Sequence, residues 1–258
     1  MGKYKQILKT VKKYRSYGVD WLYPRRCPLC QSLTKGHCFL CEDCESDIPY
    51  IEQPCCMKCG KPLYEESIAK EYCYDCEKHK RLFTRSYGLL CYEGKVKQSM
   101  YQFKYYNKRE FADWYAKELV RRYEIDWRRA NINCIIPVPI HRKKKRQRGY
   151  NQAEVLAKKM ANLLEIPCYP NGLIRVMETR PQKELDDKQR YRNLKQAFCI
   201  GNLNSKKGKQ KEEELKTVLL VDDIYTTGAT LEACTEVLLE SKLVKEVYGC
   251  TVCIGRGF

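Results

Sequence analysis

The stretch that decides the fold is Val218-Leu219-Leu220-Val221-Asp222-Asp223-Ile224-Tyr225-Thr226-Thr227-Gly228-Ala229-Thr230. An aliphatic run ends in two adjacent carboxylates, and a Thr- and Gly-rich turn follows after a gap of two residues. A helical pattern then begins at Leu231. This order predicts a buried parallel strand, an acidic strand end and a loop that leads into a helix N-terminus.

The predicted loop suits a phosphate, because a helix N-terminus offers free backbone N–H groups and a positive dipole end. The threonine hydroxyls add donors, and Gly228 lets the backbone approach a ligand closely. Asp222 and Asp223 could accept hydrogen bonds from sugar hydroxyls. The structural alternative is that the carboxylates only end a strand and that Thr-Thr-Gly only caps a helix. The combined pattern favours a sugar-phosphate site.

This stretch resembles the signature of the type I phosphoribosyltransferases, which bind phosphoribosyl pyrophosphate (PRPP) with Mg²⁺. The resemblance implies that Asp222 and Asp223 contact the ribose hydroxyls. It also implies that the following loop wraps the 5-phosphate. The loop residues that this role falls on are Thr226, Thr227, Gly228, Ala229 and Thr230.

Length and composition set the broad class. A chain of 258 residues has room for one full α/β domain and a small accessory domain. The sequence has no apolar run of membrane-spanning length, and it lacks the apolar core of a signal peptide. We therefore expect a cytoplasmic protein without stable membrane insertion. The formal net charge of +17 becomes about +13 if eight thiolates bind two Zn²⁺ ions. This charge suits nucleic acid, an acidic lipid surface or pyrophosphate, but it also fits a surface that is merely soluble.

Cysteine spacing predicts two structural zinc sites. Ten of the 17 cysteines lie between Cys27 and Cys76, mostly as Cys-x-x-Cys pairs. In a cytosolic chain such pairs indicate metal binding, and redox use would call for a thioredoxin-like strand–helix unit that the sequence lacks. Cys38 and Cys55 leave other ligand registers open, and the quartets need not be sequential. The expected ligands are Cys27, Cys30, Cys41 and Cys44 at one site, and Cys56, Cys59, Cys73 and Cys76 at the other.

The rest of the chain alternates between strand and helix patterns, which predicts an α/β fold with a parallel sheet flanked by helices. We expect a basic amphipathic helix over 1–20, a double zinc ribbon over 21–80 and the α/β domain over 81–258. For the helix, the pattern favours packing on the rest of the protein over contact with a membrane surface. Residues 201–216 have the composition of a solvated loop. The predicted strands are 86–92, 133–139, 218–221 and 246–254, and the predicted helices are 96–106, 111–123, 153–164 and 231–239.

A second constellation follows the strand that closes at Pro137-Val138-Pro139. The sequence from His141 to Gln152 is densely cationic, and it should meet Asp222 at the carboxyl edge of the sheet. We predict a cationic loop that holds a pyrophosphate leaving group, with Gly149 as the hinge of a closing lid. A disordered basic loop and a nucleic-acid contact are the alternatives.

These residues resemble the ComF family of competence-associated proteins. The resemblance rests on Pro137-Val138-Pro139, on Arg148-Gly149-Tyr150-Asn151-Gln152, on Arg180-Pro181-Gln182 and Arg190–Asn193, and on Tyr23-Pro24-Arg25-Arg26-Cys27-Pro28-Leu29-Cys30. It implies a double zinc ribbon joined to a type I phosphoribosyltransferase-like domain. It further implies a role in DNA uptake during natural transformation, with single-stranded DNA and a helicase-like partner.

On this basis Asp222, Asp223 and Arg148 are the candidate catalytic residues. Further PRPP-binding candidates beside the loop residues are Pro139, Gly149, Asn151 and Gln152. The sequence leaves three hypotheses open. The chain is a phosphoribosyltransferase with an unidentified acceptor, a regulatory module that binds PRPP without turnover, or a zinc-ribbon adaptor for nucleic acid.

Overall fold

The computed structural model describes residues 24–36, 38–64, 70–177, 194–203 and 217–255. The expected helix over 1–20, Arg180–Gln182, Arg190–Asn193 and most of the 201–216 loop lie outside these residues. Contacts divide the chain into two compact units, Met1–Ile48 and Pro49–Phe258. The first cysteine quartet therefore belongs to one unit, and the second quartet belongs to the unit that contains the sheet. The domain boundaries expected from the sequence stay a prediction.

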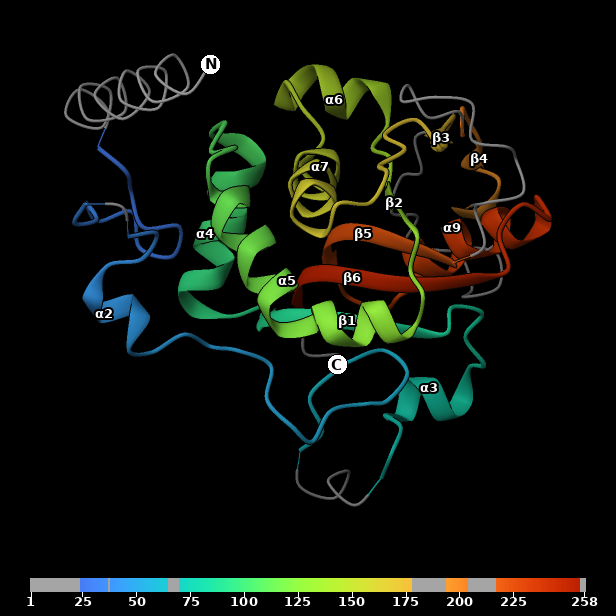
Figure 1. Cartoon of the computed structure of the whole chain (residues 1–258), viewed down its shortest axis with the longest axis horizontal. Coiled ribbons are helices and arrows are strands. Elements are labelled where there is room, and N and C mark those ends of the chain that lie inside the picture. The colour runs from blue at the N-terminus through green and yellow to red at the C-terminus, as the bar shows by residue number, and fades with distance from the viewer. Residues whose placement is uncertain (1–23, 37, 65–69, 178–193, 204–216, 256–258) are drawn as a thin grey trace, which may run out of the picture. The chain divides into compact units, whose positions relative to one another are not determined.

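A four-stranded parallel sheet forms the centre of the larger unit (Figure 1). Its order is β1 (Arg85–Cys91), β6 (Glu246–Ile254), β5 (Thr217–Tyr225) and β2 (Cys134–Pro137). Most residues of these strands are buried, as expected for a parallel sheet that is covered on both faces. The α/β class and the parallel sheet predicted from the sequence are confirmed.

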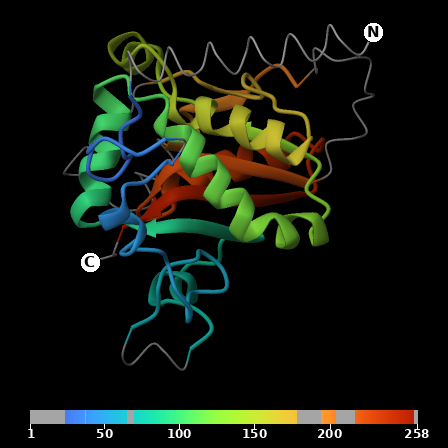
Figure 2. The ribbon, with the colours of Figure 1, turned by 60° about the vertical axis from the view of Figure 1, so that its left-hand side comes forward.

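Helices cover both faces of the sheet (Figures 1 and 2). The helices α5 (Phe111–Arg129) and α7 (Gln152–Leu164) lie side by side on one face. On α7, Leu156, Met160 and Leu164 recur every fourth residue and are buried, so one stripe of the helix packs on the sheet. The opposite face carries α9 (Ala229–Glu240). The remaining long helix, α4 (Gly94–Tyr105), directly follows β1.

Two expectations are wrong in detail. The basic segment after His141 is a short helix, α6 (Arg142–Arg148), and not a loop. The His141 side chain accepts a hydrogen bond from the N–H of Lys143 at its start, and Gly149 ends it with a φ of 77°. Lys and Arg are good helix formers, and these two caps compensate for the missing apolar face. The strand β5 also continues past the Asp pair to Tyr225 instead of ending there, because it pairs with β6 as far as Ile254.

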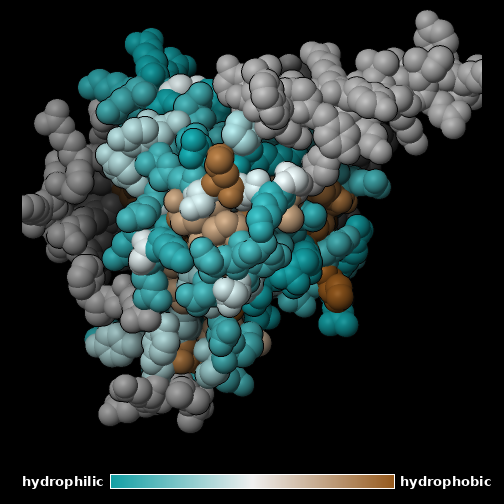
Figure 3. All heavy atoms as spheres, turned by 90° about the vertical axis from the view of Figure 1, so that its left-hand side faces the viewer, coloured by the Kyte–Doolittle hydropathy of each residue, from teal (hydrophilic) through white to brown (hydrophobic). Residues whose placement is uncertain are grey.

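Short elements complete the described part of the chain. The strands β3 (Leu173–Arg175) and β4 (Phe198–Ile200) form an antiparallel pair that the sequence did not predict. The cysteine-rich segments contain α2 (Glu42–Glu45) and α3 (Tyr74–Lys78). On the face drawn in Figure 3, hydrophilic residues cover most of the surface and hydrophobic ones form scattered small groups.

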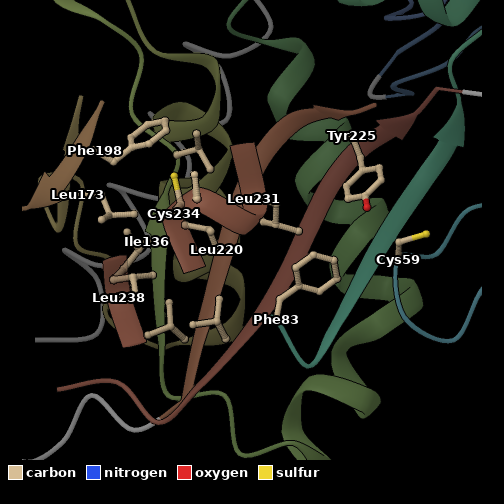
Figure 4. Close-up of a cluster of buried hydrophobic side chains, with 14 of the residues drawn as sticks. Cys59, Phe83, Ile136, Leu173, Phe198, Leu220, Tyr225, Leu231, Cys234 and Leu238 are labelled. Atoms are coloured by element: carbon tan, nitrogen blue, oxygen red, sulfur yellow. The ribbon is translucent and has the colours of Figure 1, made fainter. Parts of the chain in front are cut away.

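One hydrophobic cluster joins the sheet, α9 and the second cysteine-rich segment (Figure 4). Leu220 and Ile136 of the sheet, together with Leu231 of α9, belong to the same buried cluster as Cys59 and Phe83. The second cysteine quartet is thus part of the core under α9. Its packing matters below, because α9 begins at the predicted phosphate loop.

Candidate functional site

The two carboxylates of the opening motif point to opposite faces of the sheet, because β5 continues through them and strand side chains alternate. Asp222 faces α9 and contributes to a small pocket that is also lined by Thr226, Gly228 and Thr230. Asp223 faces the other side and pairs with Lys104 at the end of α4. The site therefore has two halves that meet at the carboxyl end of β5, where parallel sheets bind their ligands.

Asp222 is held in an environment that disfavours its charge. Burial, and after it the neighbouring Asp223 charge, raise its pKa to about 7. Its Oδ1 accepts a hydrogen bond of 2.8 Å from the N–H of Asp223. The adjoining residue of β6, Thr251, has a buried hydroxyl without a protein partner, and it lines the same pocket. These polar groups face one another with few protein partners, as a polar ligand site requires.

Lys104 is the cation closest to the Asp pair among the ion pairs of the described residues. Its Nζ lies 3.1 Å from Oδ2 of Asp223, and both side chains are more than four-fifths buried. Burial lowers the pKa of Lys104, but the charges of Asp223 and then Asp222 outweigh it and raise the pKa above its usual value. Arg148 also acts on Lys104 electrostatically. The structure thus gathers two cations and two carboxylates at this edge.

The Thr- and Gly-rich loop forms the start of α9. Gly228 is the N-cap with a φ of 79°, in the left-handed region that favours glycine. A Cβ at this position would also lie 2.2 Å from the hydroxyl of Tyr225. Gly228 has no side chain to cap the helix start, and among the first-turn N–H groups that of Ala229 donates to the hydroxyl of Thr227 at 3.4 Å. Thr226, Ala229 and Thr230 line the pocket with Gly228, and Thr227 instead contacts Arg81 through its carbonyl.

The predicted lid residues divide into two groups. Arg148 lies beside the cationic half of the site, with its guanidinium 5.0 Å from the ring centre of Tyr105 and a 3.1 Å hydrogen bond to Gln152. Gly149 ends α6, and its carbonyl accepts a hydrogen bond from Arg109.

The side chains of the other three predicted residues contact other parts of the protein. Asn151 caps α7 and donates to the carbonyl of Val138, and Gln152 donates to the carbonyls of Phe103 and Lys104. Pro139 is buried. Asn151 therefore fastens the start of α7 to the segment after β2, and Gln152 fastens it to the end of α4, which carries Lys104.

Both cysteine quartets have the geometry of a zinc site. Within each quartet the four sulfur atoms lie within 4.8 Å of one another. The closest recorded approaches are 3.4 Å between Cys30 and Cys41, and 3.5 Å between Cys59 and Cys73. A tetrahedral Zn²⁺ with bonds of about 2.3 Å separates its sulfur ligands by about 3.8 Å, so the donor sets fit the ion. With four thiolates each, both sites are structural in type and leave the ion no open position.

Comparison with known proteins agrees with this geometry. The chain matches the double zinc ribbon domain over residues 18–77 and the phosphoribosyl transferase domain over residues 150–257. It is 30% identical over 206 residues to competence protein F of Haemophilus influenzae, and the match covers 77% of this chain and 83% of that protein. The chain belongs to the ComF family.

Other ComF-like relatives are more distant. The chain is 25% identical to competence protein ComFC of Bacillus subtilis, over 78% of each protein. It is 24% identical to the DNA utilization protein YhgH of Escherichia coli strain K12, over 84% of this chain and 92% of that protein. The resemblance to the ComF family stated from the sequence is thus confirmed, and so is the pairing of a zinc ribbon with a phosphoribosyltransferase domain.

Sequence reasoning missed several residues of this ComF site. Lys104 ends a helix of ordinary amphipathic pattern, and its role depends on where that helix stops. Thr251 lies inside a strand pattern, beside Asp222 only through the pairing of β5 with β6. Arg81 lies between the cysteine pairs and β1, in a segment without helical or strand periodicity. The one available signal was the clustering of Lys104, Tyr105 and Tyr106, a basic residue followed by two aromatics.

Proposed function

We propose that the chain binds PRPP together with Mg²⁺ at the carboxyl end of β5. The observation that carries this proposal is the meeting of three kinds of group at one edge. These are the Asp222 and Asp223 carboxylates, the phosphate loop at the start of α9, and the cations Lys104 and Arg148. A sugar that bears a 5-phosphate and a pyrophosphate presents the complementary groups in the same order.

In this proposal each part of PRPP has its own contacts. The 5-phosphate lies against the N–H groups of the loop over 226–230, and the ribose hydroxyls donate to the two carboxylates. The pyrophosphate lies near Lys104 and Arg148, which balance its charge. Mg²⁺ prefers oxygen ligands, and the carboxylates of Asp222 and Asp223 are the donors that would hold it together with the substrate phosphates.

The match to the phosphoribosyl transferase domain over residues 150–257 supports phosphoribosyl transfer as the reaction. In that reaction the bond between the anomeric carbon and the pyrophosphate oxygen breaks, and its electron pair leaves with pyrophosphate. A nitrogen of the acceptor forms the new bond. Lys104 and Arg148 would stabilise the negative charge that gathers on the leaving group. We identify no general base among the described residues of the pocket, so a module that binds PRPP without turnover is the competing form of this proposal.

Calorimetry and a turnover assay test the proposal and separate its two forms. PRPP should bind in the presence of Mg²⁺, and Thr230→Val should weaken binding about tenfold by removing one hydroxyl contact to the phosphate. Thr34→Val, which removes a threonine hydroxyl from the other compact unit, is the matched control and should leave binding unchanged. Release of pyrophosphate with one of a set of nucleobases supports the enzyme. Binding without release supports the regulatory module, and absence of PRPP binding contradicts both.

A second proposed activity is contact with single-stranded DNA, and an exposed aromatic cluster favours it. Tyr101, Tyr105 and Tyr106 at the end of α4 are each at least half exposed. The ring centres of Tyr101 and Tyr105 lie 5.0 Å apart, and those of Tyr101 and Tyr106 lie 5.7 Å apart. Arg148 covers Tyr105, and the basic helix α6 ends there. Exposed rings beside cations are the usual means of holding unpaired bases and their phosphates.

Fluorescence anisotropy with a labelled oligothymidylate tests this contact. Tyr101→Ala should weaken binding about tenfold and leave the salt dependence unchanged, because it removes stacking and no charge. Alanine at Lys143, Lys144 and Lys145 should weaken binding and flatten the salt dependence, because fewer counterions are released. Tyr72→Ala removes an exposed tyrosine outside α4 and serves as the control. If the three lysines can be replaced without any change in affinity or salt slope, α6 does not contact DNA.

The names of the relatives suggest the biological setting. We propose that the chain acts in DNA uptake or utilisation in the cytoplasm, with a helicase-like protein as a further partner, as the ComF resemblance implies. None of the helices in the described part of the chain has the length and apolar character needed to cross a membrane. Loss of transformation in a deletion strain, restored by the wild-type gene, would support this setting. Unchanged uptake in a competent host would contradict it.

A further inference from the structure

The second cysteine quartet is built directly onto the edge of the sheet. Its first turn is closed by a hydrogen bond of 2.8 Å from the N–H of Cys56 to the carbonyl of Lys61. The N–H of Ser86 in β1 then donates to the carbonyl of Lys58 at 2.7 Å. A Cβ on Gly60 would lie 2.7 Å from the carbonyl oxygen of Ser86, so glycine is needed for this close approach. The turn that carries two of the four thiolates is thus fixed to β1.

The segment that leaves this quartet is bound to the phosphate loop and its helix. The Nη2 of Arg81 donates to the carbonyl of Thr227 at 2.9 Å, and the N–H of Leu82 donates to Glu232 at 2.8 Å. Glu232 lies in the first turn of α9 and is only 6% exposed. Arg81 also interacts electrostatically with Cys76 of the quartet. Both hydrogen bonds span about 150 residues of sequence and hold the start of α9.

A second link runs through Tyr225. Its ring is buried in the same cluster as Cys59, and Figure 4 shows the two side chains on neighbouring segments. Its hydroxyl lies 2.2 Å from the position that a Cβ on Gly228 would occupy. Tyr225 thus lies between the cysteine quartet and the N-cap of α9, so a shift of the quartet would displace the loop. Tight packing transmits such shifts, because buried groups have little free space to absorb them.

We propose that Arg81 is a positioning residue, supported by the second cysteine quartet, that holds the loop over 226–230 in the shape that binds a 5-phosphate. Metal at this quartet therefore raises the affinity for the 5-phosphate half of PRPP, while metal at the first quartet has no such effect. The inference rests on the proposed PRPP site, and it assigns different roles to two zinc sites of the same chemistry.

The test compares ligands that use different halves of the site. Arg81→Leu should weaken ribose 5-phosphate and PRPP about tenfold, the size expected when a hydrogen bond from a charged donor is lost. Pyrophosphate with Mg²⁺ should bind within about twofold of the wild type, because its contacts lie at Lys104 and Arg148. Arg81→Lys keeps one donor and should recover part of the affinity. Arg122→Leu is the control, since Arg122 also donates to a backbone carbonyl, that of Ile51, away from the loop.

A second test removes one zinc ligand from each quartet and compares two matched cysteines. Cys41 and Cys73 are both partly exposed ligands that cap a short helix, α2 and α3 respectively. Cys41→Ser and Cys73→Ser should each lower the bound zinc by about one ion per chain. Only Cys73→Ser should weaken ribose 5-phosphate. Equal effects of the two variants on ribose 5-phosphate would overturn the inference.

Amide hydrogen exchange keeps the inference testable apart from the proposed function. In the ligand-free protein, the N–H of Glu232 donates to the carbonyl of Gly228 in the loop, so Arg81→Leu should speed exchange of this amide at least about fivefold and leave β2 unchanged. If wild-type protein binds neither PRPP nor ribose 5-phosphate, the proposed function fails, while the exchange result still decides whether Arg81 holds the loop. Unchanged amide exchange in Arg81→Leu overturns the inference. An equal loss of affinity for ribose 5-phosphate, PRPP and pyrophosphate also overturns it, because it would mean that Arg81 only stabilises the fold.

Discussion

Asp222→Asn should make the protein more stable while it weakens ligand binding. The pKa of Asp222 rises from 3.8 to about 7 because the folded protein buries the carboxyl beside Asp223. A rise of this size corresponds to about 4 kcal/mol, which the folded state loses when Asp222 is ionised. Solvent at this half-buried site screens part of it, so we expect Asp222→Asn to stabilise the protein by about 2 kcal/mol at pH 8. The amide oxygen can still accept the hydrogen bond from the N–H of Asp223.

The pH dependence fixes the sign of this effect. Because the folded-state pKa lies above the unfolded value, the cost is fully present above pH 7 and disappears as the pH falls toward 4. The stability gap between Asp222→Asn and the wild type should therefore narrow between pH 8 and pH 6, by at most about 1 kcal/mol. Zinc binding by the thiolates weakens as the pH falls, but it does so in both proteins, so the difference between them cancels this effect.

Thermal and urea unfolding in zinc-containing buffer measure the gap. A gain of about 2 kcal/mol should raise Tm by about 4 to 8 °C for a chain of this size. Asp223→Asn is the matched control and should lower Tm, because it leaves the buried Lys104 without its carboxylate. A lower Tm for Asp222→Asn at pH 8, or a gap that widens as the pH falls, would refute the assignment of a strained carboxyl at this position.

Three further predictions concern the same edge of the sheet. PRPP affinity should fall by up to about tenfold per pH unit below pH 7, because Asp222 must lose a proton to accept the ribose, and Asp222→Asn should abolish this part of the dependence in calorimetry across pH. Lys104→Met should weaken pyrophosphate with Mg²⁺ about tenfold but leave ribose 5-phosphate as tight as in the wild type or tighter, in competition titrations. Gly228→Ala should lower the free energy of unfolding in urea by about 1 to 3 kcal/mol, because the φ of Gly228 is 79° and Tyr225 fills the Cβ position. The control is Gly36→Ala, whose Cβ would meet nothing within 4 Å, and it should lower the free energy of unfolding by less. Equal losses in the two variants would contradict the packing argument.

The sequence was sufficient where one local pattern determines structure. The aliphatic run before Asp222 and the pattern after Leu231 placed β5 and α9, and the expected bounds of the last strand equal those of β6. Paired cysteines placed both quartets, because Cys-x-x-Cys turns bring two sulfurs together whatever the surroundings. The short strands β3 and β4 were missed because three residues carry too little alternation to be recognised.

Tertiary placement accounts for what local patterns did not reveal. The segment over 142–148 has no apolar face, so its helix depends on caps at His141 and Gly149 rather than on periodicity. No local pattern indicated that Cys59 of the second quartet and Phe83 are buried together under α9. Pattern analysis along the chain treats each segment alone and cannot detect a contact such as that between Arg81 and Thr227.

Lys104 and burial together limit the negative charge of the two adjacent carboxylates. Asp223 is neutralised by Lys104, and Asp222 has a raised pKa, so the ligand-free edge carries little net charge near pH 7. If Mg²⁺ and the ribose occupy the carboxylates, Lys104 loses its partner and becomes available to the pyrophosphate beside Arg148. Gln152 holds the end of α4 in place by hydrogen bonds to the carbonyls of Phe103 and Lys104, so only the Lys104 side chain has to move. One cation can thus serve both states of the site, which explains why its removal should weaken the binding of pyrophosphate but not that of ribose 5-phosphate.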